Sequence, residues 1–212
     1  MKMTVFGATG GIGREVVRQA LDAGHTVTAV VRDAARLGIA HPALEVAVVS
    51  GLTDPEPLTA ALAGSDAALS GVGPRSRKDT TVASTSTRAI LRAMEMAGVP
   101  RFTAVSAVPV GPIPDDDSFL NRRILYPMIK SLFREIYADL ARMEDEIRRS
   151  GTEWTIVRPP RLTDKPLTGS YRTAIGANVP RGNVISRADV AHAMLAALDD
   201  PATVNQAIGV AN

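Results

Sequence analysis

Three glycines spaced as Gly-x-x-Gly-x-x-Gly, at Gly7, Gly10 and Gly13, have the clearest chemical meaning in this sequence. They lie between a short apolar run and a helix-period segment. Here the first glycine permits a tight turn, the second lets a diphosphate approach the backbone, and the third lets the helix pack close to the strand. The pattern predicts a dinucleotide-binding loop, although a purely structural turn could have the same glycines. The residues expected to hold the pyrophosphate through backbone amides are Thr9, Gly10, Gly11 and Ile12.

The charged residues after the second apolar run, at 26–31, indicate which dinucleotide would bind. An NAD-selective site usually places a carboxylate there for the ribose 2′-hydroxyl, whereas a 2′-phosphate requires a guanidinium that can donate two parallel hydrogen bonds. Arg32 comes directly after this run, Asp33 is next, and Arg36 lies a little further on. We therefore predict that NADP(H) is preferred over NAD(H). The alternative is that Asp33 turns inward and Arg32 remains in solvent.

The composition narrows the classes of protein to consider. With 212 residues and 45% hydrophobic content, the chain can bury a substantial core. No Pro/Gly/Ser-rich linker divides residues 1–212, so we predict one domain with a small C-terminal portion on the substrate side. A net charge of +2, without a basic stripe interleaved with aromatic residues, argues against nucleic acid as a partner. Cysteine is absent and the three histidines are scattered, so no metal site is expected.

The distribution of apolar residues argues against membrane association. No apolar run approaches the ~20 residues needed to cross a bilayer. Met1 leads directly into the first predicted strand, which leaves no room for a signal peptide. We therefore expect a cytoplasmic location. The hydrophobic periodicity does not predict an oligomeric state.

Short β-branched runs alternate with helix-period segments along the chain. This alternation predicts an α/β fold, a Rossmann-like doubly wound parallel sheet with helices on both faces. The predicted strands are residues 2–6, 26–31, 44–48, 67–70, 102–105 and 154–157. The predicted helices are residues 12–23, 57–63, 80–97, 120–150 with an interruption at Pro127, and 187–198. Ligands of such sheets bind beyond the carboxyl ends of the strands. The loops expected to surround one crevice are therefore 7–13, 32–36, 71–78, 106–111 and 158–168.

Several segments together resemble the atypical short-chain dehydrogenase/reductases, a group of small NAD(P)H-binding proteins. They are the glycine loop, residues 30–33 and residues 155–160 (Thr-Ile-Val-Arg-Pro-Pro). Residues 164–171, with their Pro-Leu-Thr-Gly-x-Tyr run, and residues 184–190 are more distinctive, and resemble the biliverdin reductase B or flavin reductase branch. The resemblance covers essentially the whole chain. It implies that hydride from NADPH reduces a flat conjugated small molecule, such as a flavin, tetrapyrrole or quinone-like acceptor.

The resemblance also implies roles for residues beyond the strand ends. Ser106 matches a serine that the family places beside the nicotinamide and the acceptor, where a hydroxyl can donate to a developing anion or order a proton-bearing water. The alternative is that Ser106 only satisfies a backbone group at a strand end. The further residues expected at the cofactor are Gly7, Gly13, Gly71, Val72, Gly73 and Pro159, and those expected at the acceptor are Pro160 and Arg161.

The sequence departs from the family pattern at two places. Arg161 stands where the resembled branch has a histidine after the two prolines. A fixed cation there could attract a carboxylate or phosphate of the acceptor, or it could point to solvent. Leu52 stands where the family commonly has an aspartate near the adenine, so that contact is either absent or shifted to Thr53 or Asp54.

Tyr126 and Lys130 match literally the Tyr-x-x-x-Lys pair of ordinary short-chain dehydrogenases. We interpret this match as coincidental, because counting back from the helix end near residue 151 places the expected pair at Ile136 and Leu140. The neighbouring Tyr137 has Ala141 four residues later. Without a lysine there, nothing lowers the pKa of a tyrosine toward neutrality, so a tyrosinate base is not the predicted chemistry.

Two other classes of function fit the same sequence. One is a regulator of the NmrA-like type, which binds NADP(H) without turnover and signals through a partner protein. The missing tyrosine–lysine pair supports it. The other is an NAD(P)-dependent epimerase or dehydratase acting on a nucleotide sugar. It is disfavoured because those enzymes usually add a sizeable substrate domain.

Overall fold

A computed structural model describes residues 1–74, 76, 79–113, 123–124 and 126–212. Within these residues, eight strands form one sheet in the order β3-β2-β1-β4-β5-β6-β10-β8. The parallel strands are β1 (Lys2–Phe6), β2 (Thr26–Val31), β3 (Leu44–Val48), β4 (Ala67–Ser70), β5 (Arg101–Val105), β6 (Glu153–Arg158) and β10 (Gln206–Ala211). The edge strand β8 (Arg172–Ile175) is antiparallel to β10, and the short strands β7 (Arg161–Thr163) and β9 (Val184–Ser186) pair separately.

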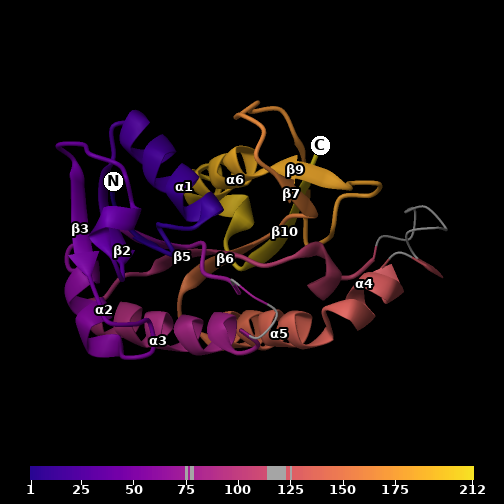
Figure 1. Ribbon diagram of the computed structural model, residues 1–212, viewed down its shortest axis with the longest axis horizontal. Coiled ribbons are helices and arrows are strands. Elements are labelled where there is room, and N and C mark those ends of the chain that lie inside the picture. The colour runs from indigo at the N-terminus through magenta and orange to yellow at the C-terminus, as the bar shows by residue number, and fades with distance from the viewer. Residues whose placement is uncertain (75, 77–78, 114–122, 125) are drawn as a thin grey trace.

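Helices cover both faces of this sheet. They are α1 (Gly11–Asp22), α2 (Pro55–Leu62), α3 (Val82–Ala97), α4 (Tyr126–Leu132), α5 (Arg134–Arg149) and α6 (Arg187–Asp199). The short 3₁₀ turns are η1 (Ala34–Arg36), η2 (Val108–Val110) and η4 (Pro201–Thr203). Figure 1 shows α1 and α6 on one side of the sheet and α2, α3 and α5 on the other. None of the helices formed by the described residues is long and apolar enough to cross a membrane.

The two layers of helices create two hydrophobic cores, one on each face of the sheet. Along β1, Val5 packs into the core with α1 and α6, whereas Phe6 packs into the core with α2, α3 and α5. The same alternation occurs on β2, where Ala29 and Val30 face opposite sides. Because central strands are buried on both faces, their sequences are mostly apolar, with buried threonines at a few positions, as is typical of parallel sheets. The predicted doubly wound α/β fold is confirmed.

The six predicted strands are present, but β7, β8, β9 and β10 were not predicted. Two of them, β7 and β9, have only three residues each. The strand β10 contains Gly209, and a glycine inside a strand weakens the strand signal. The structure explains this glycine, since a Cβ there would lie 2.6 Å from the carbonyl oxygen of Ala177.

The long helix predicted over residues 120–150 is divided, but at a different residue from the one predicted. The break falls at Phe133, between α4 and α5, rather than at Pro127. Pro127 is the second residue of α4, where the missing amide hydrogen costs no helical hydrogen bond. The predicted start at Leu120 lies outside the described residues.

Candidate cofactor and acceptor site

Three of the predicted cofactor residues contact one another where β1, α1 and β4 meet. Gly7 has a φ of +72°, which favours glycine. A Cβ on Gly13 would lie 2.2 Å from the carbonyl oxygen of Gly7, and a Cβ on Gly71 would lie 3.0 Å from the amide nitrogen of Gly13. Side chains are therefore excluded from this junction, and the backbone itself forms the surface that a ligand would meet.

The N-terminus of α1 is open to an anion. Gly10 caps the helix, and its amide donates to the carbonyl oxygen of Gly7 over 2.8 Å. No side chain of the described residues caps α1, and its first turn has no acidic residue. Gly11 is exposed, whereas Ile12 is buried and anchors the turn. The first-turn amides and the positive end of the helix dipole fit a diphosphate at this position.

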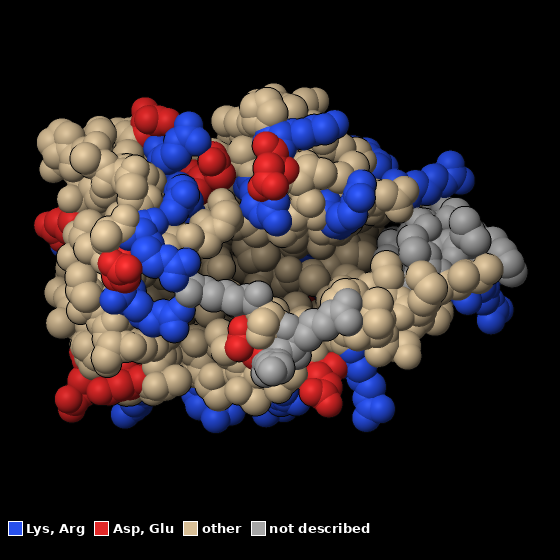
Figure 2. All heavy atoms as spheres, in the orientation of Figure 1, with Lys and Arg blue, Asp and Glu red and all other residues tan. Residues whose placement is uncertain are grey.

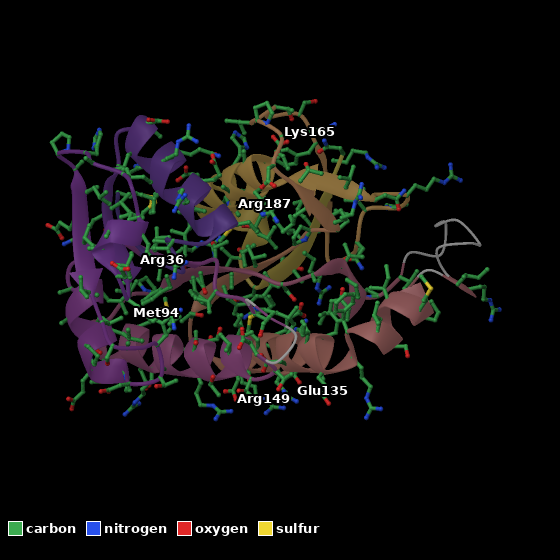
Figure 3. All side chains as sticks on the ribbon, in the orientation of Figure 1. Arg36, Met94, Glu135, Arg149, Lys165 and Arg187 are labelled. Atoms are coloured by element: carbon green, nitrogen blue, oxygen red, sulfur yellow. The ribbon has the colours of Figure 1, made fainter. Side chains whose placement is uncertain are left out.

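Basic side chains gather beside the loop that follows β2. Arg32 and Arg36 are both exposed, and Arg14 reaches from α1 to donate from Nη2 to the carbonyl oxygen of Arg36 over 2.7 Å. Asp33 is exposed too, and its Oδ1 accepts from the amide of Ala35 over 3.0 Å, which caps η1. Figure 2 shows a hollow in the middle of this face, with basic side chains along its left and upper rims, and Figure 3 labels Arg36 on the left.

The loops after β5 and β6 are joined by backbone hydrogen bonds that fix Ser106. The amide of Ser106 donates to the carbonyl oxygen of Val157 over 2.8 Å, and the amide of Val108 donates to that of Pro159 over 3.0 Å. Ser106 is 6% exposed. Its hydroxyl makes no hydrogen bond of ordinary geometry with any described residue. The structure thus brings the buried Ser106 and Pro159 together at the carboxyl edge of the sheet.

A buried ion pair lies beside Ser106, and the sequence alone did not indicate it. Arg158, the last residue of β6, donates from Nε to Oε1 of Glu144 over 2.9 Å, and Arg148 donates to the same carboxylate from the helix surface. Burial raises the pKa of Glu144. The hydrogen bonds from Arg158, the nearby Ser106 hydroxyl and the charges of Arg158 and Arg148 lower the pKa by more than burial raises it, so the net pKa lies below the ordinary value. The hydroxyl of Ser106 is therefore close to a carboxyl group that stays ionised.

The two predicted acceptor residues lie at the start of the small β7–β9 sheet: Pro160 directly precedes β7, and Arg161 is its first residue. Pro160 is half-buried, and Arg161 is exposed and pairs in register with Val184. Their contact with an acceptor stays a prediction. The remaining predicted cofactor residues follow β4: the amide of Gly71 donates to the carbonyl oxygen of Phe6 over 3.0 Å, Val72 is buried, and Gly73 has open space around it.

The distinctive Pro-Leu-Thr-Gly-x-Tyr segment is held by the first turn of α6. The carboxylate of Asp189 accepts from the amides of Thr168 and Gly169, over 2.8 and 3.0 Å, and from the hydroxyl of Ser186. Burial raises the pKa of Asp189, but these hydrogen bonds together hold it below its ordinary value. Asp189 therefore lies in the first turn of α6 and also fixes the segment.

Neither Lys130 nor Tyr137 has the surroundings expected of the residues that form a tyrosinate base. Tyr126 and Lys130 both lie in α4, and the side chain of Lys130 is exposed. Tyr137 is half-buried in α5, and burial raises its pKa. This shift is opposite to the one that a tyrosinate base needs.

A separate cavity of about 540 Å³ lies at the amino ends of β5 and β6, opposite to the carboxyl ends where the predicted site lies. It is lined by the ends of α3 and α5 and by the turns that lead into β5 and β6, Met94 and Arg149 among them (Figure 3). None of the predicted site residues lines it. Ligands of doubly wound sheets bind at the opposite, carboxyl edge.

This fold, with a glycine loop leading into α1 and basic residues after β2, defines a Rossmann-type dinucleotide-binding protein. The chain belongs to the NAD(P)H-binding family, whose model matches residues 7–201. A relative from Bacillus subtilis, the "Uncharacterized sugar epimerase YhfK", is 32% identical over 214 residues, which cover 98% of this chain and 92% of that protein.

Solved structures share the same fold. A protein of Streptococcus pneumoniae to which NADH-flavin reductase activity is attributed has a TM-score of 0.81 and 24% identity, with 100% of this chain and 99% of that one covered. A short-chain dehydrogenase/reductase of Veillonella parvula, solved in complex with NADP, has a TM-score of 0.82 and 20% identity, with 100% and 94% covered. The protein is therefore a member of the NAD(P)H-binding family whose fold is shared with these two solved structures.

Proposed function

We propose that this protein is an NADPH-dependent reductase that delivers hydride to a flat conjugated acceptor, a flavin, tetrapyrrole or quinone-like compound. The observation that carries the proposal is the buried Ser106 hydroxyl, which has no ordinary hydrogen-bond partner among the described residues and lies just beyond β5. Bound NADPH would supply the hydride. Ser106 would donate a hydrogen bond to the negative charge that develops on the acceptor.

The proposed preference for NADPH rests on Arg32, with Arg36 and Arg14 beside it. A 2′-phosphate adds about two negative charges at neutral pH, which a guanidinium can engage through paired hydrogen bonds. Asp33, the residue that would favour a free 2′-hydroxyl, already accepts from the backbone of η1. The charge balance at the end of β2 therefore favours the phosphorylated cofactor.

Oxidation of NADPH and of NADH, each against FMN, FAD, riboflavin, biliverdin isomers and simple quinones, tests the proposal. Calorimetry on the same sample gives the dissociation constant of each cofactor. Saturable turnover of one acceptor, with NADPH preferred, is the expected result. Tight NADPH binding without turnover of any acceptor would contradict it.

The second candidate is a regulator that binds NADP(H) without turnover. It is favoured by the absence of a basic residue four positions after Tyr137, where Ala141 stands, and by the raised pKa of that tyrosine. Binding without turnover, together with capture of a protein partner whose affinity changes with NADPH, would establish it. Turnover of an acceptor would exclude it as the whole function.

A sugar epimerase is the third candidate, because YhfK is named as one and has nearly the same length as this chain. The similar length removes the expectation that an epimerase must have a larger substrate domain. An epimerase returns its hydride to the same substrate. It would therefore interconvert nucleotide sugars with no net consumption of NAD(P)H, which chromatography of the sugars would detect.

A further inference from the structure

Arg187, the first residue of α6, extends its side chain across the glycine loop. A Cβ on Gly11 would lie 2.5 Å from Cδ of Arg187 and 2.8 Å from its Nε. Gly11 is the first residue of α1, so the guanidinium stem lies directly over the first turn of that helix. Figure 3 labels Arg187 next to α1, and Figure 2 shows basic side chains on this upper rim of the hollow.

Two contacts hold Arg187 in this place. Its Nη1 donates to Oδ1 of Asp164 over 2.5 Å, and Gln19 of α1 donates to the carbonyl oxygen of Ala188 over 2.9 Å, which ties the first turn of α6 to α1. The side chain of Asp164 is 89% exposed. Such an exposed ion pair contributes little to stability. Its evident effect is to fix where the guanidinium lies.

We propose that Arg187 is a binding residue for the diphosphate of the dinucleotide. The first-turn amides of α1 carry only about half a positive charge between them, whereas the diphosphate carries about two negative charges. A guanidinium over Gly11 supplies a full positive charge and a planar pair of donors at the same surface. Gly11 then has a second role, since any side chain there would displace Arg187.

This role differs from the one proposed for Arg32. Arg187 is to recognise the diphosphate that NADPH and NADH share, whereas Arg32 is to recognise the 2′-phosphate that only NADPH has. The inference rests on the NAD(P)H binding of the family and on no particular reaction. A failure to reduce any acceptor would leave it standing, because its test measures binding alone.

Calorimetry of Arg187→Gln with four ligands tests the proposal. Affinity for NADPH, NADH and ADP-ribose should each fall about ten- to a hundredfold, as expected for lost charge-assisted hydrogen bonds. Affinity for 2′-AMP, which has no diphosphate, should stay within about twofold. Arg187→Lys should recover part of the lost affinity, since it restores the charge without the planar donors.

Two variants distinguish direct binding by Arg187 from the effects of the ion pair and of overall charge. Asp164→Asn breaks the ion pair but keeps the guanidinium, and should change the three affinities far less than Arg187→Gln. Arg18→Gln removes an exposed cation of α1 that pairs with Glu15, and controls for a general loss of positive charge. Equal losses in Asp164→Asn and Arg187→Gln, or unchanged affinities in Arg187→Gln, would overturn the proposal.

Gly11→Ala provides an independent check. Its new methyl group meets the flexible Arg187 side chain, so the fold should hold while the guanidinium moves. The variant that combines Gly11→Ala with Arg187→Gln should lose no more ADP-ribose affinity than Arg187→Gln alone. The reason is that both substitutions remove the same contact, the one between Arg187 and the diphosphate. Strictly additive losses would show that the two residues act separately and would overturn the proposal. Absence of dinucleotide binding by the unaltered protein would overturn the cofactor assignment as well.

Discussion

The guanidinium of Arg158 lies buried against the carboxylate of Glu144, with Nε donating to Oε1 over 2.9 Å and Nη2 donating to Oε2 over 2.5 Å. The side chains of Arg158 and Glu144 are 5% and 0% exposed. This pair connects the carboxyl end of β6 to α5, beneath the loop that contains Ser106. The crevice is thus supported by a charged contact on one side and by the glycine junction on the other.

Glu144→Gln should destabilise the protein by about 3–5 kcal/mol, because it leaves the buried Arg158 charge without a counterion. The free energy of unfolding in denaturant measures this change. Asp145→Asn is the matched control, since Asp145 is the adjacent residue and its bond with Arg148 is longer, at 3.4 Å, and exposed. A loss below about 1 kcal/mol in Glu144→Gln would mean that Arg158 finds other partners or water.

Stability should fall as the solution is acidified below the ordinary carboxyl range. The pKa values of Glu144 and Asp189 are both lowered in the folded protein. Their contribution is therefore fully present above the unfolded pKa, near 4.5 for Glu144, and is lost as the pH falls through the lower folded values. Denaturant unfolding between neutral and acid pH measures it.

The Asp189→Asn variant isolates one part of this acid dependence. Its curve of stability against pH should be flatter than that of the unaltered protein, because one lowered carboxyl group is gone. An Asp199→Asn variant, at the exposed end of α6, is the control. Identical slopes for all three proteins would contradict the role given to Asp189.

Gly13→Ala should disrupt the cofactor loop even though alanine is a small residue. The new Cβ would lie 2.2 Å from a backbone oxygen, that of Gly7, so backbone must move rather than a flexible side chain. We expect a loss of about 1–3 kcal/mol in stability, typical of overpacking, together with weaker NADPH binding. Gly151→Ala, which has open space around it, should show neither effect. An unchanged melting temperature for Gly13→Ala would show that the junction is less tight than the distances indicate.

The parts of the site that could be predicted from sequence are those set by neighbouring residues. The glycine spacing of the first loop follows from local steric demands, so Gly7 and Gly13 were predictable. The Arg158–Glu144 pair joins a strand to a helix, and Arg187 reaches Gly11 from the far end of the chain. Contacts between residues so far apart in the sequence leave no signal in its hydrophobic periodicity. The strand β10 was missed for a related reason. Gly209 is required by the close approach of the backbone of residues 177–179, which is distant in the sequence, and not by the strand in which it lies.

Arg32→Ala should weaken NADPH binding about ten- to a hundredfold and change NADH binding less than about twofold. The reason is that a guanidinium after β2 engages the 2′-phosphate, which NADH lacks. Calorimetry with both cofactors on one protein sample makes NADH the matched control for folding. Equal effects on both cofactors would remove the 2′-phosphate role from Arg32.

Ser106→Ala should lower turnover about a hundredfold, the usual effect of removing one donor to a developing anion, and leave the NADPH dissociation constant within about twofold. The stability of the variant should fall by no more than about 1 kcal/mol, because the hydroxyl makes no hydrogen bond of ordinary geometry with the described residues and loses only its proximity to the Glu144 carboxylate. Stopped-flow or steady-state oxidation of NADPH with the preferred acceptor gives the rate, and thermal unfolding gives the stability. Ser106→Thr, which keeps the hydroxyl, should retain more activity than Ser106→Ala. An unchanged rate in the alanine variant would assign Ser106 a structural role. The loop after β5 would then supply no hydrogen-bond donor to the acceptor.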